Sequence, residues 1–316
     1  MQILFYILVW ILILILFTTL ILFFIWAWSL MKAKVPFIVI PNSVLPYIHK
    51  ALDIKKDSIV YDLGCGDGKV LFYSSKLIPE AKSFIDYLQK AQIPFLFLTN
   101  NSEQTALDLK LKLQNLGIQG ITEANFITSA MATSIFLKSQ KPNAKVFVVG
   151  KGGLINELYN AGFSLTEHNP DYVVVGKTND FNFTMLKKAV NLINQGAKFI
   201  GTNPDVIDPI ENGIEPACGT LLAAIEKATN KAPYVIGKPN ALIMTIATRQ
   251  LNLHAEEILM IGDRMDTDVV AGLEAGMKTC LVLSGVSTKE TLHDFPFQPD
   301  FVFDNVGQVE LMLKKV

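Results

Sequence analysis

The chain has 316 residues, which is enough for two domains and a short additional segment. Half of its residues are hydrophobic, and the mean hydropathy of +0.35 is high for a globular enzyme. The formal net charge is −1, so the chain has no basic excess, and we expect no nucleic-acid partner.

The hydrophobic excess is concentrated at the N-terminus. No Asp, Glu, Lys or Arg occurs from Met1 to Met31, and a helix of that length extends about 45 Å, more than the hydrocarbon core of a bilayer. We therefore predict one transmembrane helix over residues 1–31. A cleaved signal peptide lacks support, since no basic region precedes the span and no clear cleavage site follows it; a buried core helix is a third alternative. Lys32 and Lys34 then predict a single-pass membrane protein with a cytoplasmic catalytic domain.

Residues 32–82 contain a proline-bearing connector and then one strand–turn–helix pattern. Ile59-Val60-Tyr61 predicts a short strand, and a glycine-rich turn follows it at Gly64-Cys65-Gly66-Asp67-Gly68. A helix is predicted over residues 70–77.

From Pro79 onward, strand and helix patterns alternate to the C-terminus. Helices are predicted over residues 81–91 and 107–116, where apolar residues recur at helical spacing. Strands are predicted as apolar runs bounded by Gly, Asn, Asp or Pro, at residues 95–98, 146–149, 172–175, 198–200, 234–236, 258–261, 279–283 and 301–303. This alternation favours an α/β fold with parallel sheets covered by helices on both faces.

Polar residues follow two of the predicted strands. Thr99 and Asn100 end the strand at 95–98, and Lys238 lies between Gly237 and Pro239 after the strand at 234–236. Ligands of open α/β sheets bind at the carboxyl ends of strands. A hydroxyl and an amide there can bind phosphate oxygens, and a lysine can neutralise a phosphoryl group. The alternatives are a helix N-cap in the Asn-Asn-Ser segment and a solvated loop lysine.

Three carboxylates, Asp263, Asp266 and Asp268, follow the strand at 258–261. Carboxylates this close repel one another unless a cation compensates them, and hard oxygen ligands suit Mg²⁺. The pattern therefore predicts a magnesium site. The alternative is a helix cap at Asp263 with the other two side chains solvated.

In this order, Leu98-Thr99-Asn100-Asn101, Gly237-Lys238-Pro239 and the Gly262–Asp268 segment resemble the haloacid dehalogenase-like (HAD) superfamily, above all its IIA subclass of nucleotidase and 4-nitrophenylphosphatase-like enzymes. The resemblance extends over about residues 79–316. It implies a Rossmann-like core at residues 83–128 and 225–316, with an α/β cap domain inserted at 129–224. It also implies Mg²⁺-dependent hydrolysis of a small phosphomonoester, such as a nucleotide or sugar phosphate, through an aspartyl-phosphate.

The resemblance also implies roles for single residues. Thr99 and Asn100 would bind the phosphoryl group, and Lys238 would steady its charge. Asp263 would hold Mg²⁺ with Asp268 nearby. In the cap, the segment Thr202-Asn203-Pro204-Asp205 resembles the loop that reads substrate, so the implied substrate ligands are Asn203 and Asp205.

The chain departs from the family at the nucleophile. The family has two aspartates, two residues apart, directly after its first core strand, whereas Asp62 and Asp67 are five residues apart here. If Asp62 is the nucleophile, Gly64 occupies the position of the acid/base partner. If Asp67 is the acid/base partner, Cys65 occupies the position of the nucleophile. Asp62 and Asp67 are both candidate catalytic residues. The alternative is a phospho-ligand binding module without turnover.

The glycine-rich turn has a second resemblance, to the first motif of class I S-adenosylmethionine-dependent methyltransferases, over about residues 43–82. It implies S-adenosylmethionine binding at Asp62, Gly64, Gly66 and Gly68, with Asp86 at a workable spacing for the ribose. An ordinary glycine turn is the alternative. The two resemblances meet near residues 78–82, and residues 58–61 can take the place of the missing first HAD strand.

The three cysteines, Cys65, Cys218 and Cys280, are far apart in the sequence and odd in number. No Cys-x-x-Cys pair indicates zinc or redox chemistry, so we expect reduced thiols.

Overall fold

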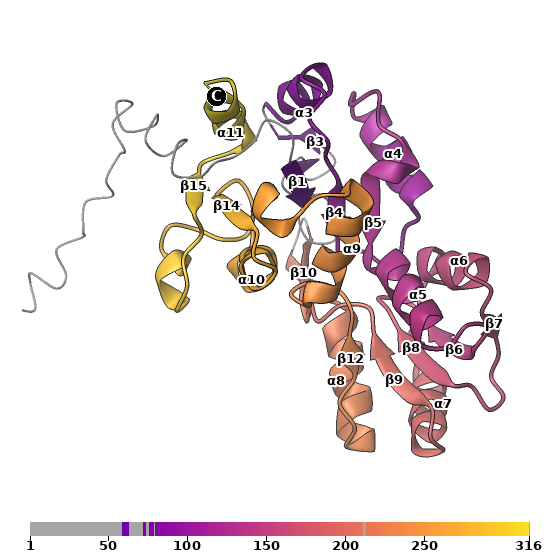
Figure 1. The fold of residues 1–316 in the computed structure, drawn as a ribbon. Helices are drawn as coiled ribbons and strands as arrows, with labels where there is room; N and C mark the ends of the chain where they lie inside the picture. The colour runs from indigo at the N-terminus through magenta and orange to yellow at the C-terminus, as the bar shows by residue number, and fades with distance from the viewer. Residues whose placement is uncertain (1–58, 63–71, 74–75, 79, 211–212, 316) are drawn as a thin grey trace, which may run out of the picture. The chain divides into compact units, whose positions relative to one another are not determined.

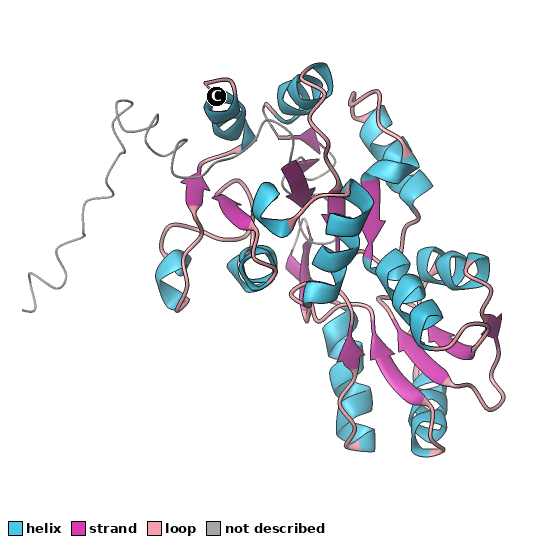
Figure 2. Cartoon of the chain, in the orientation of Figure 1, coloured by secondary structure: helices cyan, strands magenta, loops and turns pink. Residues whose placement is uncertain are grey.

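The structure is a computed structural model that describes residues 59–62, 72–73, 76–78, 80–210 and 213–315. Helices and strands alternate through these residues, as expected from the sequence (Figures 1 and 2). Most predicted strands and both predicted helices after Pro79 form within one or two residues of the expected bounds.

The first sheet has six parallel strands in the order β15-β14-β13-β1-β4-β5. The central strand β1 pairs with β13 on one side and with β4 on the other. The segment 59–62 therefore takes the place of the missing first HAD strand. The strands are β1 (Ile59–Asp62), β4 (Phe97–Thr99), β5 (Phe126–Thr128), β13 (Leu259–Gly262), β14 (Lys278–Val282) and β15 (Phe301–Phe303).

Helices cover both faces of this sheet because successive residues of a strand point to opposite faces. Phe97 packs with α3, α4 and α11, whereas its neighbour Leu98 packs with α9 and α10. Such burial on both sides explains why the strands are continuous apolar runs. The helices are α3 (Ala81–Lys90), α4 (Ala106–Asn115), α9 (Ala241–Leu251), α10 (Val270–Glu274) and α11 (Val306–Leu313), with short helical turns η1 (Glu123–Asn125), η2 (Ala255–Glu257), η3 (Met265–Val269) and η4 (Thr291–Asp294).

The second sheet and its helices lie in the part of the sequence that we predict as the cap, and the strand order is β12-β9-β8-β6-β7. Its last strand in sequence, β12, pairs with β9, so this sheet extends beyond residue 224, where we placed the end of the predicted cap. A separate hairpin, β10–β11, lies in the same part of the sequence. The elements are α5 (Ser129–Gln140), β6 (Lys145–Val149), α6 (Gly152–Asn160), β7 (Ser164–Leu165), β8 (Tyr172–Val175), α7 (Phe183–Asn194), β9 (Lys198–Gly201), β10 (Ile207–Ile210), β11 (Gly213–Pro216), α8 (Cys218–Thr229) and β12 (Tyr234–Val235).

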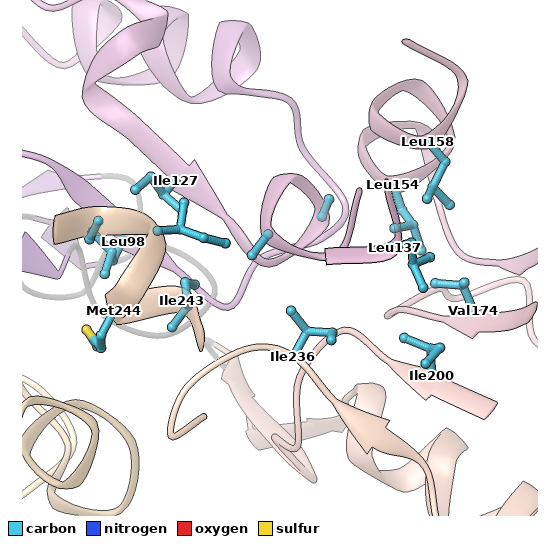
Figure 3. Packing of buried hydrophobic residues seen from close by; sticks show 14 of the residues in the cluster. Leu98, Ile127, Leu137, Leu154, Leu158, Val174, Ile200, Ile236, Ile243 and Met244 are labelled. Carbon is cyan, nitrogen blue, oxygen red and sulfur yellow. The ribbon is translucent and has the colours of Figure 1, made fainter. Parts of the chain in front are cut away.

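One hydrophobic cluster joins the core to the cap. It includes Leu98 and Ile127 of the first sheet together with Val174 and Ile200 of the second. Ile236, directly after β12, belongs to the same cluster (Figure 3). The two sheets are thus joined by one continuous apolar cluster, and this cluster supports the polar loops at the ends of their strands.

The helix that we predicted over residues 70–77 is wrong. Phe72–Tyr73 (β2) and Lys76–Leu77 (β3) pair as a small antiparallel ladder instead. The adjacent aromatic residues Phe72 and Tyr73 favour a strand over a helix.

Asp86, which we considered as a ribose ligand at the end of a second methyltransferase strand, is part of helix α3. Its carboxylate pairs with Lys82 one turn earlier, at 2.6 Å. Phe84, Ile85 and Leu88 form the buried side of this helix, so the helical spacing of apolar residues determines the structure here.

The prediction of a single-pass membrane protein with a cytoplasmic catalytic domain is corrected. Within the part of the chain that the structure describes, no helix has the length and apolar character needed to cross a bilayer. The span that we predicted, residues 1–31, lies outside the described residues, as does most of the connector that follows it.

The packing of α4 gives a matched test of the core. Leu113 is 1% exposed and packs against the first sheet, whereas Leu111 on the same helix is 47% exposed. We expect Leu113→Ala to lower the free energy of unfolding by about 2–5 kcal/mol, because it removes buried methyl groups and leaves a cavity. Leu111→Ala should change it by less than about 0.5 kcal/mol. Urea unfolding of both variants checks this, and equal losses would contradict the assigned packing.

Candidate active site

The carboxyl ends of three neighbouring strands bring the predicted site residues to one edge of the first sheet. Thr99 ends β4, and Asp263 directly follows β13. Asp62 ends β1 between them, where its backbone pairs with Leu98, the residue before Thr99. A parallel sheet therefore gathers residues that are far apart in the sequence.

Asn100 connects three segments of the chain. Its side chain is buried, and its Nδ2 donates to Asp205 Oδ2 at 2.8 Å and to the Lys238 carbonyl at 3.0 Å. Its Oδ1 accepts from the Lys238 backbone N–H at 2.8 Å. The Asn100 side chain thus holds the Lys238 loop and the loop at Asp205 in place, and its binding of phosphate stays a prediction.

The loop around Asn100 is not a helix N-cap. Helix α4 begins later, and its N-cap is Thr105, whose hydroxyl accepts from the Asp108 backbone N–H at 3.1 Å. Asn101 Oδ1 instead accepts from two backbone N–H groups of the loop itself. Thr99 is 3% exposed, and its Oγ1 accepts from the Asn101 N–H at 3.1 Å. A threonine hydroxyl in this position still has a proton to donate.

Lys238 is fully buried and is not a solvated loop lysine. Its Nζ lies 2.9 Å from Asp268 Oδ1, and both side chains are 0% exposed. Asp268 Oδ2 accepts from the backbone N–H groups of Asp263 and Arg264, each at 3.0 Å. Both oxygens of Asp268 are therefore engaged, so this residue positions Lys238 and the turn after β13.

Asp263 is also fully buried, and one of its oxygens is open. Oδ2 accepts from the Val286 backbone N–H at 2.8 Å, whereas Oδ1 has no hydrogen-bond partner among the described residues. Burial, and then the charge of Asp268, raise the pKa of Asp263 to about 6. A cation next to Oδ1 would offset both effects.

The residues present fit Mg²⁺. Asp263 offers a buried carboxylate oxygen without a partner, and hard oxygen ligands are what Mg²⁺ prefers. Among the described residues no group of three or more His, Cys, Asp or Glu stands together as a metal site. Mg²⁺ in phosphoryl-transfer sites is held by one or two carboxylates plus waters and substrate phosphate, so one protein carboxylate here agrees with that ion.

The third carboxylate of this turn lies away from the site. Asp266 is half exposed, and it pairs with Arg264 at 2.6 Å. Of the three carboxylates of this turn, only Asp263 and Asp268 are buried together.

Two cap residues reach the site. Asn203 Nδ2 donates to Asp205 Oδ2 at 2.7 Å, the same oxygen that Asn100 contacts. Among the described residues, Asp205 Oδ1 is buried without a hydrogen-bond partner, and Arg264 Nη1 lies 3.9 Å from it. The structure therefore places the predicted substrate loop directly against the core loop.

Gly285 is a site residue that we did not predict. A Cβ at this position would lie 2.0 Å from Asp263 Oδ2 and would displace the carboxylate. The signal was present, since Ser284-Gly285-Val286 follows the strand β14 at the same edge of the sheet.

The glycine-rich turn lies outside the described residues. Asp62 is placed by its backbone at the end of β1, whereas Gly64, Gly66, Asp67 and Gly68 lie outside the described residues.

Comparisons with known proteins agree with this arrangement. Residues 66–164 match the family model described as haloacid dehalogenase-like hydrolase, and residues 235–309 match a second HAD hydrolase model. The chain is 39% identical over 248 residues to the ribonucleotide monophosphatase NagD of Escherichia coli K12, a match that covers 78% of this chain and 97% of NagD. It is 44% identical over 240 residues to the dihydroxyacetone phosphatase of Corynebacterium glutamicum, covering 76% and 87%. Among solved structures, the p-nitrophenyl phosphatase from Archaeoglobus fulgidus has a TM-score of 0.76 and 33% identity, covering 83% of this chain and 100% of that one.

The first family match begins at Gly66, inside the glycine-rich turn. The second half of that turn, which we also assigned to S-adenosylmethionine, therefore belongs to the hydrolase match. Helix α3, in place of a second methyltransferase strand, removes the other support for that cofactor.

The raised pKa of Asp263 predicts how Mg²⁺ binding depends on pH. Below pH about 6 the carboxyl binds a proton that Mg²⁺ must displace, so affinity should fall by about tenfold per pH unit. Above pH 6 the carboxylate is ionised, and affinity should level off. Calorimetric titration with Mg²⁺ between pH 5 and 8 measures this, with Asp263→Asn as the control that removes the ligand. An affinity that stays constant from pH 5 to 7 would contradict the assignment.

Gly285→Ala tests the shape of the site. The new methyl group must push the Asp263 carboxylate aside, so Mg²⁺ affinity should fall by about tenfold or more, in the range measured for changes around metal ligands. Gly152→Ala is the matched control, because a Cβ there meets nothing within 4 Å. If the two variants bind Mg²⁺ equally well, the contact between Gly285 and Asp263 does not position the metal ligand.

Proposed function

The chain belongs to the haloacid dehalogenase-like hydrolase family, within its IIA subclass, and on this premise we propose that it is a Mg²⁺-dependent phosphatase of small nucleotide or sugar phosphates. The family and the named phosphatases among its relatives make it a hydrolase acting on phosphoric monoesters. The relatives act on a ribonucleotide, on dihydroxyacetone phosphate and on p-nitrophenyl phosphate, according to their names, so the shared chemistry is a phosphate ester of a small molecule.

One observation carries this proposal: Asp268 joins a buried lysine to the turn that holds a buried carboxylate. Lys238 Nζ lies 2.9 Å from Asp268 Oδ1, Asp268 Oδ2 accepts from the Asp263 N–H, and Asp263 Oδ1 has no hydrogen-bond partner among the described residues. A cation would satisfy the Asp263 oxygen, and the fixed positive charge of Lys238 favours an anionic phosphate next to it.

The residues have separate tasks in binding the phosphoryl group. Lys238 supplies a fixed positive charge, and Asp268 holds it in one orientation. Thr99 supplies a hydroxyl donor from the end of β4. Mg²⁺, bound through Asp263, would neutralise charge that develops on the phosphoryl oxygens.

We assign the nucleophile to Asp62. Its backbone ends the central strand β1, between the strands that carry Thr99 and Asp263. A carboxylate there would attack phosphorus, the ester P–O bond would break, and the departing alcohol would take up a proton. Water would then cleave the acyl phosphate, releasing phosphate and restoring the carboxylate. Asp67, the second predicted catalytic carboxylate, lies outside the described residues.

Phosphate release from 4-nitrophenyl phosphate and from a panel of nucleotide and sugar phosphates, with Mg²⁺, tests the proposal. Asp62→Asn should lower kcat about 10²-fold or more because no acyl phosphate forms, and Asp263→Asn should lose Mg²⁺-dependent activity to a similar extent. Asp266→Asn is the matched control. It alters a carboxylate of the same turn that is half exposed and paired with Arg264, so activity should stay within about threefold.

The outcomes separate the alternatives. Loss of activity in Asp67→Asn but not in Asp62→Asn would move the nucleophile to the glycine-rich turn. If folded protein binds phosphate esters but releases no phosphate above the Asp263→Asn background, the chain is a binding module, and the phosphatase proposal is wrong.

A further inference from the structure

The loop that follows β4 packs directly against two glycines of the predicted cap. This loop carries the buried side chain of Asn100 and continues through Ser102 and Glu103. A Cβ at Gly153 would lie 2.7 Å from the backbone carbonyl carbon of Glu103, and a Cβ at Gly176 would lie 2.7 Å from Ser102 Oγ. Both distances are shorter than a Cβ contact allows, so the close approach requires positions without a side chain.

Two hydrogen bonds cross the same loop–cap contact. The Gly153 N–H donates to the Glu103 carbonyl at 2.9 Å, and the Lys177 N–H donates to Ser102 Oγ at 3.3 Å. Ser102 is 2% exposed, so the second bond is shielded from water. The loop is therefore attached to the predicted cap at two points in addition to the contact through Asn100.

The carboxylate of Glu103 adds ion pairs to this contact. Its Oε1 lies 2.8 Å from Nζ of Lys151, the residue before helix α6, and its Oε2 lies 3.7 Å from Lys177 Nζ. The Lys177 ammonium also pairs with Asp208 of β10, at 2.6 Å, and with Glu215 of β11. One carboxylate of the loop is thus connected through two lysines to the start of α6 and to the hairpin β10–β11.

The central pair of this network is shielded from solvent and stays charged. The side chains of Lys177 and Glu103 are 14% and 19% exposed. Burial acts to lower the pKa of Lys177, but its hydrogen bonds to Asp208 and Glu215 outweigh burial and raise that pKa above its ordinary value. Charges that are partly removed from water attract each other more strongly than exposed pairs do, so Glu103 is held more firmly than a surface carboxylate.

We propose that Glu103 is a positioning residue, which holds the loop after β4 and the predicted cap together as one unit. While its ion pairs are intact, the loop and the predicted cap move together, and Thr99 and Asn100 keep the geometry of the site. When the pairs break, the two separate more often and the site loses that geometry. The effect on substrate rests on the proposed phosphatase function, whereas the loop–cap contact itself does not.

Amide hydrogen exchange of the full chain tests the contact without turnover. The N–H groups of Gly153 and Lys177 cross the contact, whereas the Gly176 N–H donates to the Val149 carbonyl within the predicted cap. Glu103→Gln removes the charge and nearly keeps the shape. Exchange at the two crossing amides should accelerate at least about threefold, while exchange at Gly176 stays unchanged. Equal acceleration at all three amides, or none at any of them, would overturn the proposal.

A double-mutant cycle assigns the effect to the ion pair. Lys151→Gln should accelerate exchange at the same two amides, and in the double variant with Glu103→Gln the two single effects should not multiply, because both remove one interaction. Lys141→Gln is the matched control. It breaks an ion pair of 2.6 Å with Asp171 that lies wholly within the predicted cap, so neither amide should change. Effects of Glu103 and Lys151 that multiply would show that the two residues act independently and would contradict the pairing.

Two neighbouring glycines test the close approach. Gly153→Ala places a methyl group against the Glu103 backbone, so exchange at the Lys177 N–H should accelerate about tenfold as the loop is pushed away. Gly152→Ala is the control, since a Cβ there meets nothing within 4 Å. The same exchange rate in both variants would show that this approach does not hold the loop.

Hydrolysis of 4-nitrophenyl phosphate with Mg²⁺ connects the contact to the site. Glu103→Gln lowers the fraction of molecules with a competent site, so KM should rise about threefold, while kcat, measured once substrate has selected that state, should fall by less than about twofold. An unchanged KM would overturn the positioning role. If the unsubstituted chain releases no phosphate, the phosphatase proposal fails, and hydrogen exchange still decides whether Glu103 holds the loop.

Discussion

The buried pair of Lys238 and Asp268 is the constraint on which the rest of the site depends. Moving an ammonium and a carboxylate out of water costs several kcal/mol per ion, and their mutual attraction offsets this only when further hydrogen bonds complete the geometry. Here the backbone N–H groups of Asp263 and Arg264 complete Asp268. The turn after β13 is consequently fixed in the shape that buries Asp263 beside the pair. The same arrangement requires a glycine at position 262, since a Cβ there would lie 2.2 Å from Asp268 Cβ.

Sequence reasoning succeeded where a local pattern decides the structure. Strands such as 172–175 and 258–261 are buried on both faces, so they are visible as uninterrupted apolar runs. Thr99 and Asp263 lie at the carboxyl ends of strands as predicted, while the roles assigned to them stay predictions. It failed over residues 70–77, where a short aromatic segment fits a helix and a strand equally well in spacing. The membrane localisation also failed, because it rested on composition alone.

Contacts between distant segments were outside the reach of the sequence. Nothing near Asn100 indicates that its amide would bind Asp205 of the cap and the backbone of Lys238, since both contacts exist only after cap and core have packed together. The loop–cap contact at Glu103 has the same origin, as its partners Lys151 and Lys177 come from a distant part of the sequence. In contrast, the replacement of the first HAD strand by residues 59–62 could be foreseen, because a central parallel strand needs only apolar residues and two neighbours with open hydrogen-bonding edges.

The triple attachment of Asn100 has a consequence for the order in which the chain folds. Its partners Asp205 and Lys238 are 105 and 138 residues away in the sequence, so both contacts close long loops and are made late, after local helices and hairpins. A growing chain on the ribosome cannot hold the Lys238 loop in place until nearly the whole sequence has been synthesised. We therefore expect a chain that ends before Lys238 to lack the anchored form of the loop at Asn100, because two of its three side-chain hydrogen bonds go to the backbone of Lys238.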